Sequence, residues 1–255
     1  MKKNIFLEYG FNSDYRKRAK LIKAMGFDGV FLEWNDSIDS IAKIVREEGL
    51  EIETIHLPYA LANSIWEETP DGEIYYQQII DGVLKAGQLK INTVIVHTLK
   101  GQTPPSVSLL GLERMKAIVK LASEKKVHVA LENIRLPEYF DYFFENIPSP
   151  WLRFCFDAGH ANCFSRDIEV FPWEKYQSRL ICVHLHDNFG LSDQHQMPFT
   201  GNINWEKLMK KLKEIKYPGP LTLEVVLKHT EGLDEDEFIK TAKATIDKLA
   251  GLYDK

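Results

Sequence analysis

The sequence predicts an α/β protein folded as a single (β/α)8 barrel domain over residues 1–255. Short apolar segments alternate with amphipathic segments along the chain, which is typical of parallel strands joined by helices. Eight such units fit into 255 residues, and barrels of this kind commonly have about 250 residues. Several strands are apolar on both faces, as buried parallel strands require. An open, doubly wound sheet is the alternative, but no glycine-rich phosphate-binding motif follows a predicted strand.

The predicted strands are separated by enough chain for one helix or loop each. Apolar runs place them at 4–9, 29–34, 53–56, 93–97, 127–133, 152–157, 180–186 and 221–226, and Pro58 stops the third. Apolar residues at helical spacing predict helices at 15–25, 37–48, 75–89, 109–125, 139–146, 208–216 and 235–252. Ser37 and Ser40 are cap candidates for the second helix. Segments 69–72 and 101–108 are predicted to be surface loops.

Composition narrows the class of protein. The net charge of −5 gives no electrostatic reason to expect nucleic-acid binding, although binding through a local basic cleft is still an alternative. The three cysteines, Cys155, Cys163 and Cys182, form no CxxC pair and suit buried thiols in a reducing compartment. The N-terminal apolar run is too short for a signal peptide, and no run approaches the length of a membrane span. We therefore expect a cytoplasmic enzyme with no membrane partner, and a homo-oligomer is left open.

Side chains that can bind a metal recur at the ends of the predicted strands. In a barrel these ends converge on one face, and that face carries the chemistry. Mixed oxygen and nitrogen ligands suit divalent cations such as Zn²⁺, Mn²⁺, Mg²⁺ or Co²⁺. From the third strand to the eighth, the residues are His56, His97, Glu132, Asp157, His184, His186 and Glu224.

Each of these residues also has a structural explanation. Glu132 and Glu224 suit buried salt bridges, because a carboxylate in an apolar strand needs a partner. Asp157 precedes Ala-Gly and suits a turn or a helix cap, and His97 suits a core histidine with its hydrogen bonds satisfied. Six strand ends would each need a separate structural explanation, and this coincidence is less plausible than any one explanation alone. A shared metal site is therefore preferred.

Eight segments carry a family resemblance, and in order along the chain they are IHLPY, IVHT, ALEN, FDAGH, VHLHDN, DQH, TGNINW and LTLEVV. Together they resemble the xylose isomerase-like barrel superfamily, which also contains endonuclease IV. The resemblance covers nearly the whole chain. Its sugar isomerase and epimerase branch implies one divalent metal bound by Glu132, Asp157, His184 and Glu224. Its endonuclease IV branch implies up to three zinc ions, with the additional ligands His56, His97, His160, Asp193 and His195. All nine positions carry suitable residues, so both branches stay open; Asp193 and His195 otherwise suit a polar surface loop.

We expect a sugar isomerase or epimerase of carbohydrate metabolism that acts on a small sugar or sugar-like molecule. A bound cation would polarise the carbonyl and an adjacent hydroxyl. The resemblance implies that Glu132 and Glu224 remove and return the proton through an enediolate. The candidate substrate contacts are His160, His186, Arg135 and Trp34.

The runner-up is a zinc-dependent phosphodiesterase acting on abasic DNA. The histidine-rich set supports it, but the acidic chain shows no basic and aromatic loop for gripping a duplex. A metal-dependent dehydratase or lyase and a non-catalytic binding protein are the remaining alternatives.

Overall fold

The computed structural model describes residues 1–165, 170–229 and 232–255. Within these residues, eight strands form one sheet in the order β7-β6-β5-β4-β3-β2-β1-β8. Neighbouring strands run parallel, and Leu185, just after β7, forms a parallel bridge with Leu223 of β8. This topology is the (β/α)8 barrel that the sequence predicts.

The chain divides into two compact units, which are described in turn. The first consists of Met1–Glu53 and Phe156–Lys255, and the second of Thr54–Cys155. That residues 1–255 form a single domain stays a prediction.

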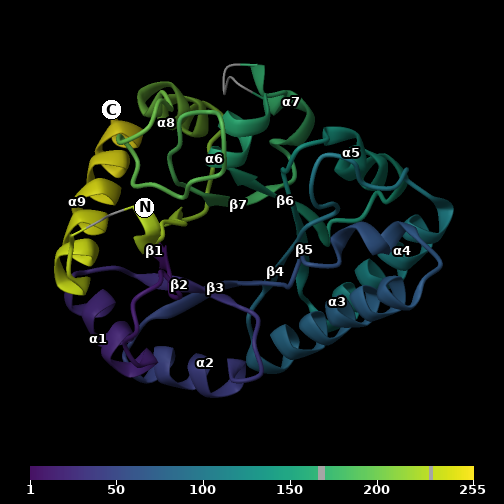
Figure 1. Ribbon diagram of the computed structural model, residues 1–255, viewed down its shortest axis with the longest axis horizontal. Coiled ribbons are helices and arrows are strands. Elements are labelled where there is room, and N and C mark those ends of the chain that lie inside the picture. Colours follow the sequence, from purple (N-terminus) through teal and green to yellow (C-terminus); the bar gives the residue numbers. More distant parts are fainter. Residues whose placement is uncertain (166–169, 230–231) are drawn as a thin grey trace. The chain divides into compact units, whose positions relative to one another are not determined.

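The first unit holds the strands and helices at both ends of the sequence. Its helix α9 begins with a capping box, in which Asp234 and Glu237 satisfy each other's backbone N–H groups. Helix α8 lies beside α9, and α1 contacts both α2 and α9 (Figure 1). Its elements are β1 (Lys3–Phe6), α1 (Tyr15–Ala24), β2 (Gly29–Glu33), α2 (Ile38–Glu47), the start of β3 (Glu51–His56), the end of β6 (Leu152–Asp157), α6 (Ala158–His160), the π-helix η2 (Ala161–Ser165), α7 (Trp173–Tyr176), β7 (Leu180–His184), α8 (Trp205–Glu214), β8 (Leu221–Leu223), η4 (Leu227–His229) and α9 (Glu235–Asp254).

The second unit is built around the adjacent helices α3 and α4 (Figure 1). Trp66 and Phe143 stack in its core, with ring centroids 4.7 Å apart. Such aromatic pairs contribute about 0.5–1.5 kcal/mol beyond the burial of their area. Its elements are the end of β3, η1 (Ala62–Trp66), α3 (Pro70–Leu89), β4 (Thr93–Val96), α4 (Leu109–Lys125), β5 (His128–Glu132), α5 (Pro137–Asn146) and the start of β6.

The prediction of a loop at 69–72 is wrong, because α3 begins at Pro70. The side chain of Thr69 accepts a hydrogen bond from the backbone N–H of Gly72 at 3.1 Å, and this caps the helix. Pro70 at the first helical position loses nothing, since its missing N–H would have had no partner there. The helix therefore starts five residues before Tyr75, where apolar periodicity alone placed it.

Three strands end two or three residues earlier than predicted, at Phe6, His184 and Leu223, and three others end one residue earlier. The chain beyond them still makes isolated hydrogen bonds to its neighbours, such as Glu224 N–H to the Leu185 carbonyl at 3.1 Å. An apolar pattern does not distinguish a strand from such an extension, so the predicted strands extend too far.

None of the helices within the described residues is long and apolar enough to cross a membrane.

Candidate metal centre

Three of the four ligands predicted for a single metal lie in the first unit, each at or just after a strand end. Asp157 ends β6, His184 ends β7, and Glu224 directly follows β8. All three are buried, and Asp157 has no exposed surface. The Nδ1 atom of His184 lies 2.9 Å from an oxygen of Glu224. An imidazole and two carboxylates with so little access to water are suited to a cation.

The ring of His184 packs against a stack of aromatic side chains. Phe31 of β2 stacks on it, with centroids 4.7 Å apart and an interplanar angle of 18°. Phe6 of β1 stacks on Phe31 in turn, at 4.6 Å. This apolar column and the Glu224 carboxylate together fix the orientation of the His184 ring.

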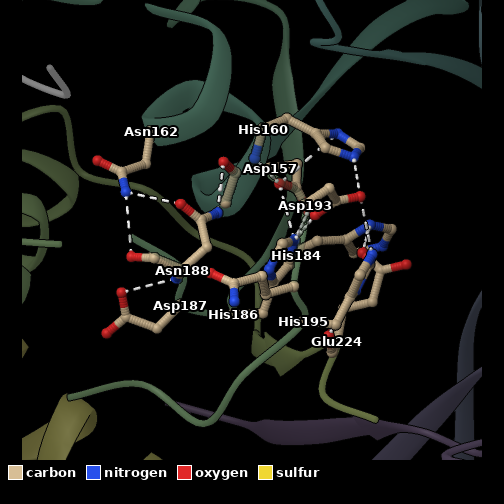
Figure 2. A network of polar contacts seen from close by, with 12 residues as sticks. Asp157, His160, Asn162, His184, His186, Asp187, Asn188, Asp193, His195 and Glu224 are labelled. Atoms are coloured by element: carbon tan, nitrogen blue, oxygen red, sulfur yellow. Dashed lines mark hydrogen bonds and ion pairs between the residues drawn. The ribbon is translucent and has the colours of Figure 1, made fainter. Parts of the chain in front are cut away.

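A second group in the same unit gathers around Asp193, in the segment between β7 and α8. One oxygen of Asp193 lies 3.2 Å from Nε2 of His160 and 3.1 Å from Nε2 of His195 (Figure 2). His186 lies 3.7 Å from the other oxygen, and its ring stacks on that of His195 at 4.0 Å. The four residues each offer a ligand atom within 4.8 Å of the others.

The charges in this group reinforce one another when no metal is bound. Burial works against an ionised Asp193, but hydrogen bonds from His160 and His195 outweigh it and hold the pKa of Asp193 well below its usual value. Burial likewise opposes a charged His195. The hydrogen bond to Asp193 and the nearby Glu224 carboxylate overcome it and raise the pKa of His195 to about 9. The metal-free group is thus held together by ion pairs that a cation would replace.

The second unit holds the remaining predicted ligands. His56 ends β3, His97 directly follows β4, and Glu132 ends β5. An oxygen of Glu132 lies 2.5 Å from Nε2 of His97 and 3.4 Å from Nε2 of His56. The two imidazole nitrogens are 3.2 Å apart. All three side chains are buried.

The donor chemistry of both groups fits a transition metal. Three imidazoles with a carboxylate in one unit, and two imidazoles with a carboxylate in the other, are ligand sets that zinc accepts. Within the described residues, the buried Nδ1 of His186 has no hydrogen-bond partner. A buried nitrogen without a partner is costly, and reorientation of its ring toward a cation would remove that cost.

Two predicted substrate contacts lie in the segments that follow β2 and β5. Trp34 directly follows β2, and Arg135 lies in the connection between β5 and α5; both are partly buried. Their roles stay predictions, as do those of the other predicted site residues.

Sequence reasoning missed Glu8, which lies two residues beyond β1. Its carboxyl accepts a long hydrogen bond from the Glu33 backbone at 3.4 Å. Burial, opposed by this hydrogen bond and reinforced by the Glu33 carboxylate, raises the pKa of Glu8 to about 8. A carboxyl in the EYGF segment has no spacing that signals such an environment.

The sequence has curated relatives and the fold has many solved counterparts. An uncharacterized protein of Methanocaldococcus jannaschii is 30% identical over 188 residues. That match covers 67% of this chain and 63% of the relative, so the chain spans less than two thirds of the relative's own length. D-psicose 3-epimerase from Clostridium cellulolyticum H10 has a similar structure, with a TM-score of 0.81 at 16% identity and 99% of both chains covered. A D-tagatose 3-epimerase-like protein has a TM-score of 0.79 at 22% identity, with 100% of this chain and 98% of its own covered.

The model of one family matches most of the sequence. It is the model of the xylose isomerase-like TIM barrel, and it matches residues 19–249. That span takes in every predicted ligand and seven of the eight strands. The chain therefore belongs to the xylose isomerase-like TIM barrel family.

Proposed function

We propose that this protein is a divalent-metal-dependent sugar epimerase or isomerase, and that a ketose is its substrate. The observation that carries the proposal is the set of buried imidazoles and carboxylates at strand ends in a chain of the xylose isomerase-like family. The structural counterparts named as sugar 3-epimerases support epimerisation over the other reactions of this fold.

In the proposed site, Glu132, Asp157, His184 and Glu224 would supply the ligands of one cation. A bound cation would polarise the substrate carbonyl and a neighbouring hydroxyl as a Lewis acid. The choice among zinc, manganese, magnesium and cobalt is left to measurement, since this mixed set suits several of them.

The two glutamates would do the proton chemistry. One carboxylate takes the proton from the carbon next to the carbonyl, which leaves a planar enediolate. The second carboxylate returns a proton from the opposite face, and the configuration at that carbon is inverted. Glu132 and Glu224 are our choice for these roles. His160, His186, Arg135 and Trp34 are the proposed contacts for the remaining hydroxyl groups.

Exchange in heavy water tests the proposal directly. Metal-loaded protein is incubated in D₂O with a panel of free and phosphorylated ketoses and aldoses, and products are analysed by NMR. Ketose 3-epimerisation puts deuterium at C3, whereas aldose–ketose isomerisation puts it at C1 or C2. Absence of deuterium from every ketose and aldose offered would contradict the proposal. The variant Glu51→Gln, at an exposed position at the start of β3, is the matched control.

A second candidate is a zinc-dependent phosphodiesterase of the endonuclease IV type acting on abasic DNA. The observation that favours it is the presence of two further ligand groups, one around Asp193 and one formed by His56, His97 and Glu132. Elemental analysis of protein purified without chelator separates the two. About one metal per chain favours the sugar enzyme, whereas two or three zinc ions favour the phosphodiesterase, and cleavage of abasic DNA is then the decisive assay.

A further inference from the structure

Asp187 lies three residues beyond the end of β7, and its side chain has no exposed surface. One carboxylate oxygen accepts hydrogen bonds from the backbone N–H groups of Asn188 (2.9 Å) and Ile203 (3.2 Å). The other accepts from the backbone N–H of Phe199 (2.9 Å) and from Nε1 of Trp205 (2.8 Å). Four donors occupy the usual acceptor positions of a carboxylate. Asp187 is therefore saturated and has no acceptor to offer a substrate or a metal.

The donors come from both ends of one segment, residues 188–205, which contains neither helix nor named strand until α8 begins at Trp205. The backbone of Asp187 also pairs with that of Gln196, with N–H to carbonyl distances of 2.8 and 3.0 Å. Beginning, middle and end of the segment are thus bound to a single residue. This segment carries Asp193 and His195, so the place of both depends on Asp187.

The segment also contains backbone that would not persist unsupported. His195 and Phe199 have φ angles of 49° and 74°, in the left-handed region that residues with a side chain rarely adopt. The N–H of Phe199 is held by Asp187 itself. A Cβ at Gly201 would lie 2.3 Å from an Asp187 oxygen, so only glycine lets the chain pass this close to the carboxylate.

Asn188, the neighbour of Asp187, is hydrogen-bonded to the segment that carries His160. The side chain of Asn188 donates to the carbonyl of Gly159 at 2.9 Å and accepts from Asn162 at 2.8 Å (Figure 2). Gly159 is in α6 with His160, and Asn162 is in the π-helix that follows. The two halves of the group around Asp193 are therefore anchored to one another at Asp187 and Asn188.

We propose that Asp187 is a positioning residue: its carboxylate, without touching substrate or metal, fixes Asp193 and His195 opposite His160. The inference is independent of the reaction that the site performs, because it concerns the geometry of the metal-free group. It can be tested without an assay of activity.

The test is the ring ¹⁵N spectrum of the eight histidines in metal-free protein, assigned by single histidine substitutions. Nitrogen shifts of an imidazole report its tautomer and hydrogen bonds. In Asp187→Asn, an amide N–H₂ faces two donors in place of an acceptor, and we expect the segment to move. The signals of His160 and His195 should then shift to the positions found in Asp193→Asn, in which their common partner is changed directly.

Two further variants separate positioning from general loss of stability. Leu212→Ala, in the buried core of α8, lowers stability without touching Asp187 and should leave both signals at their wild-type positions. Trp205→Phe removes a single donor, and it should shift them partway even if Asp187→Asn does not fold. Wild-type signals in both Asp187→Asn and Trp205→Phe would overturn the proposal. So would equal shifts in Leu212→Ala, or an Asp193→Asn spectrum identical to wild type.

Discussion

Phe31 lies flat against the imidazole of His184, with ring centroids 4.7 Å apart and an angle of 18° between the planes. The two residues are more than 150 positions apart in the sequence, on β2 and β7. The stack leaves the His184 ring little freedom to turn away from Glu224, whose oxygen is 2.9 Å from Nδ1. A ligand whose orientation is fixed in advance binds a cation with less loss of conformational entropy.

Phe31→Leu should weaken metal binding more than it weakens the fold. Leucine keeps most of the apolar contact but not the flat surface on which His184 rests. We expect metal affinity to fall by about 10-fold, the lower end of the range for groups that orient ligands. Competition with a chromophoric chelator measures this, and urea denaturation measures the stability. Unchanged affinity in a folded Phe31→Leu protein would show that the stack does not orient the ligand.

The roles of the two glutamates can be tested in metal-saturated variants. Glu132→Gln and Glu224→Gln each remove a group that can accept a proton, while keeping an oxygen for the cation. We expect kcat to fall by about 10²–10⁴, the usual contribution of a positioned acid or base. Metal content is measured in the same samples, because both residues are also proposed ligands. Full turnover by either variant would rule out the proton-transfer role for that residue.

Metal content also distinguishes the single-metal site from a multinuclear one. His184→Ala should lose the bound cation, since it removes a proposed ligand. His56→Ala and His97→Ala should retain about one metal per chain if their contacts with Glu132 are structural. Elemental analysis of the three variants decides this. Loss of zinc from the His56 or His97 variant would instead support the three-metal alternative.

Local sequence patterns predict individual strands and helices, but they do not predict contacts that depend on how those elements pack. The bounds of β6 and α4 agree with prediction, because an apolar run and a helical period are local patterns. The prediction misplaces the start of α3, because apolar periodicity does not detect the helix cap at Thr69. Contacts such as Phe31 with His184, or Trp205 with Asp187, join residues whose proximity no local pattern encodes.

Glu8 should make the stability of the protein depend on pH. Its pKa is about 8 in the folded chain against an ordinary value of 4.5, so the folded state keeps a proton that the unfolded state releases between these values. Stability therefore falls as pH rises from about 4.5 to 8. Glu8→Gln cannot ionise, and its free energy of unfolding should rise relative to wild type across this window.

The size of this effect has an upper limit of about 5 kcal/mol, from 1.36 kcal/mol per pKa unit. We expect less, since solvent relaxes around a partly exposed group. Urea denaturation of both proteins at pH 5 and pH 8 measures the difference. Parallel pH dependences for wild type and Glu8→Gln would mean that Glu8 is ionised in the folded protein at neutral pH.

Gly159 should be intolerant of any side chain, because the ring of His186 occupies the space that a Cβ would need. A Cβ there would lie 1.8 Å from Cε1 of His186, which is fully buried and cannot retreat into solvent. Gly159→Ala should displace His186 from the Asp157 carboxylate, now 3.1 Å away, and lower the free energy of unfolding by about 1–3 kcal/mol or more.

Gly251→Ala is the matched control, since no atom lies within 4 Å of its Cβ. In helix α9 that change should stabilise the protein by about 0.5–1 kcal/mol. If urea denaturation shows equal stability for Gly159→Ala and wild type, the close packing of His186 on Gly159 is not present in solution.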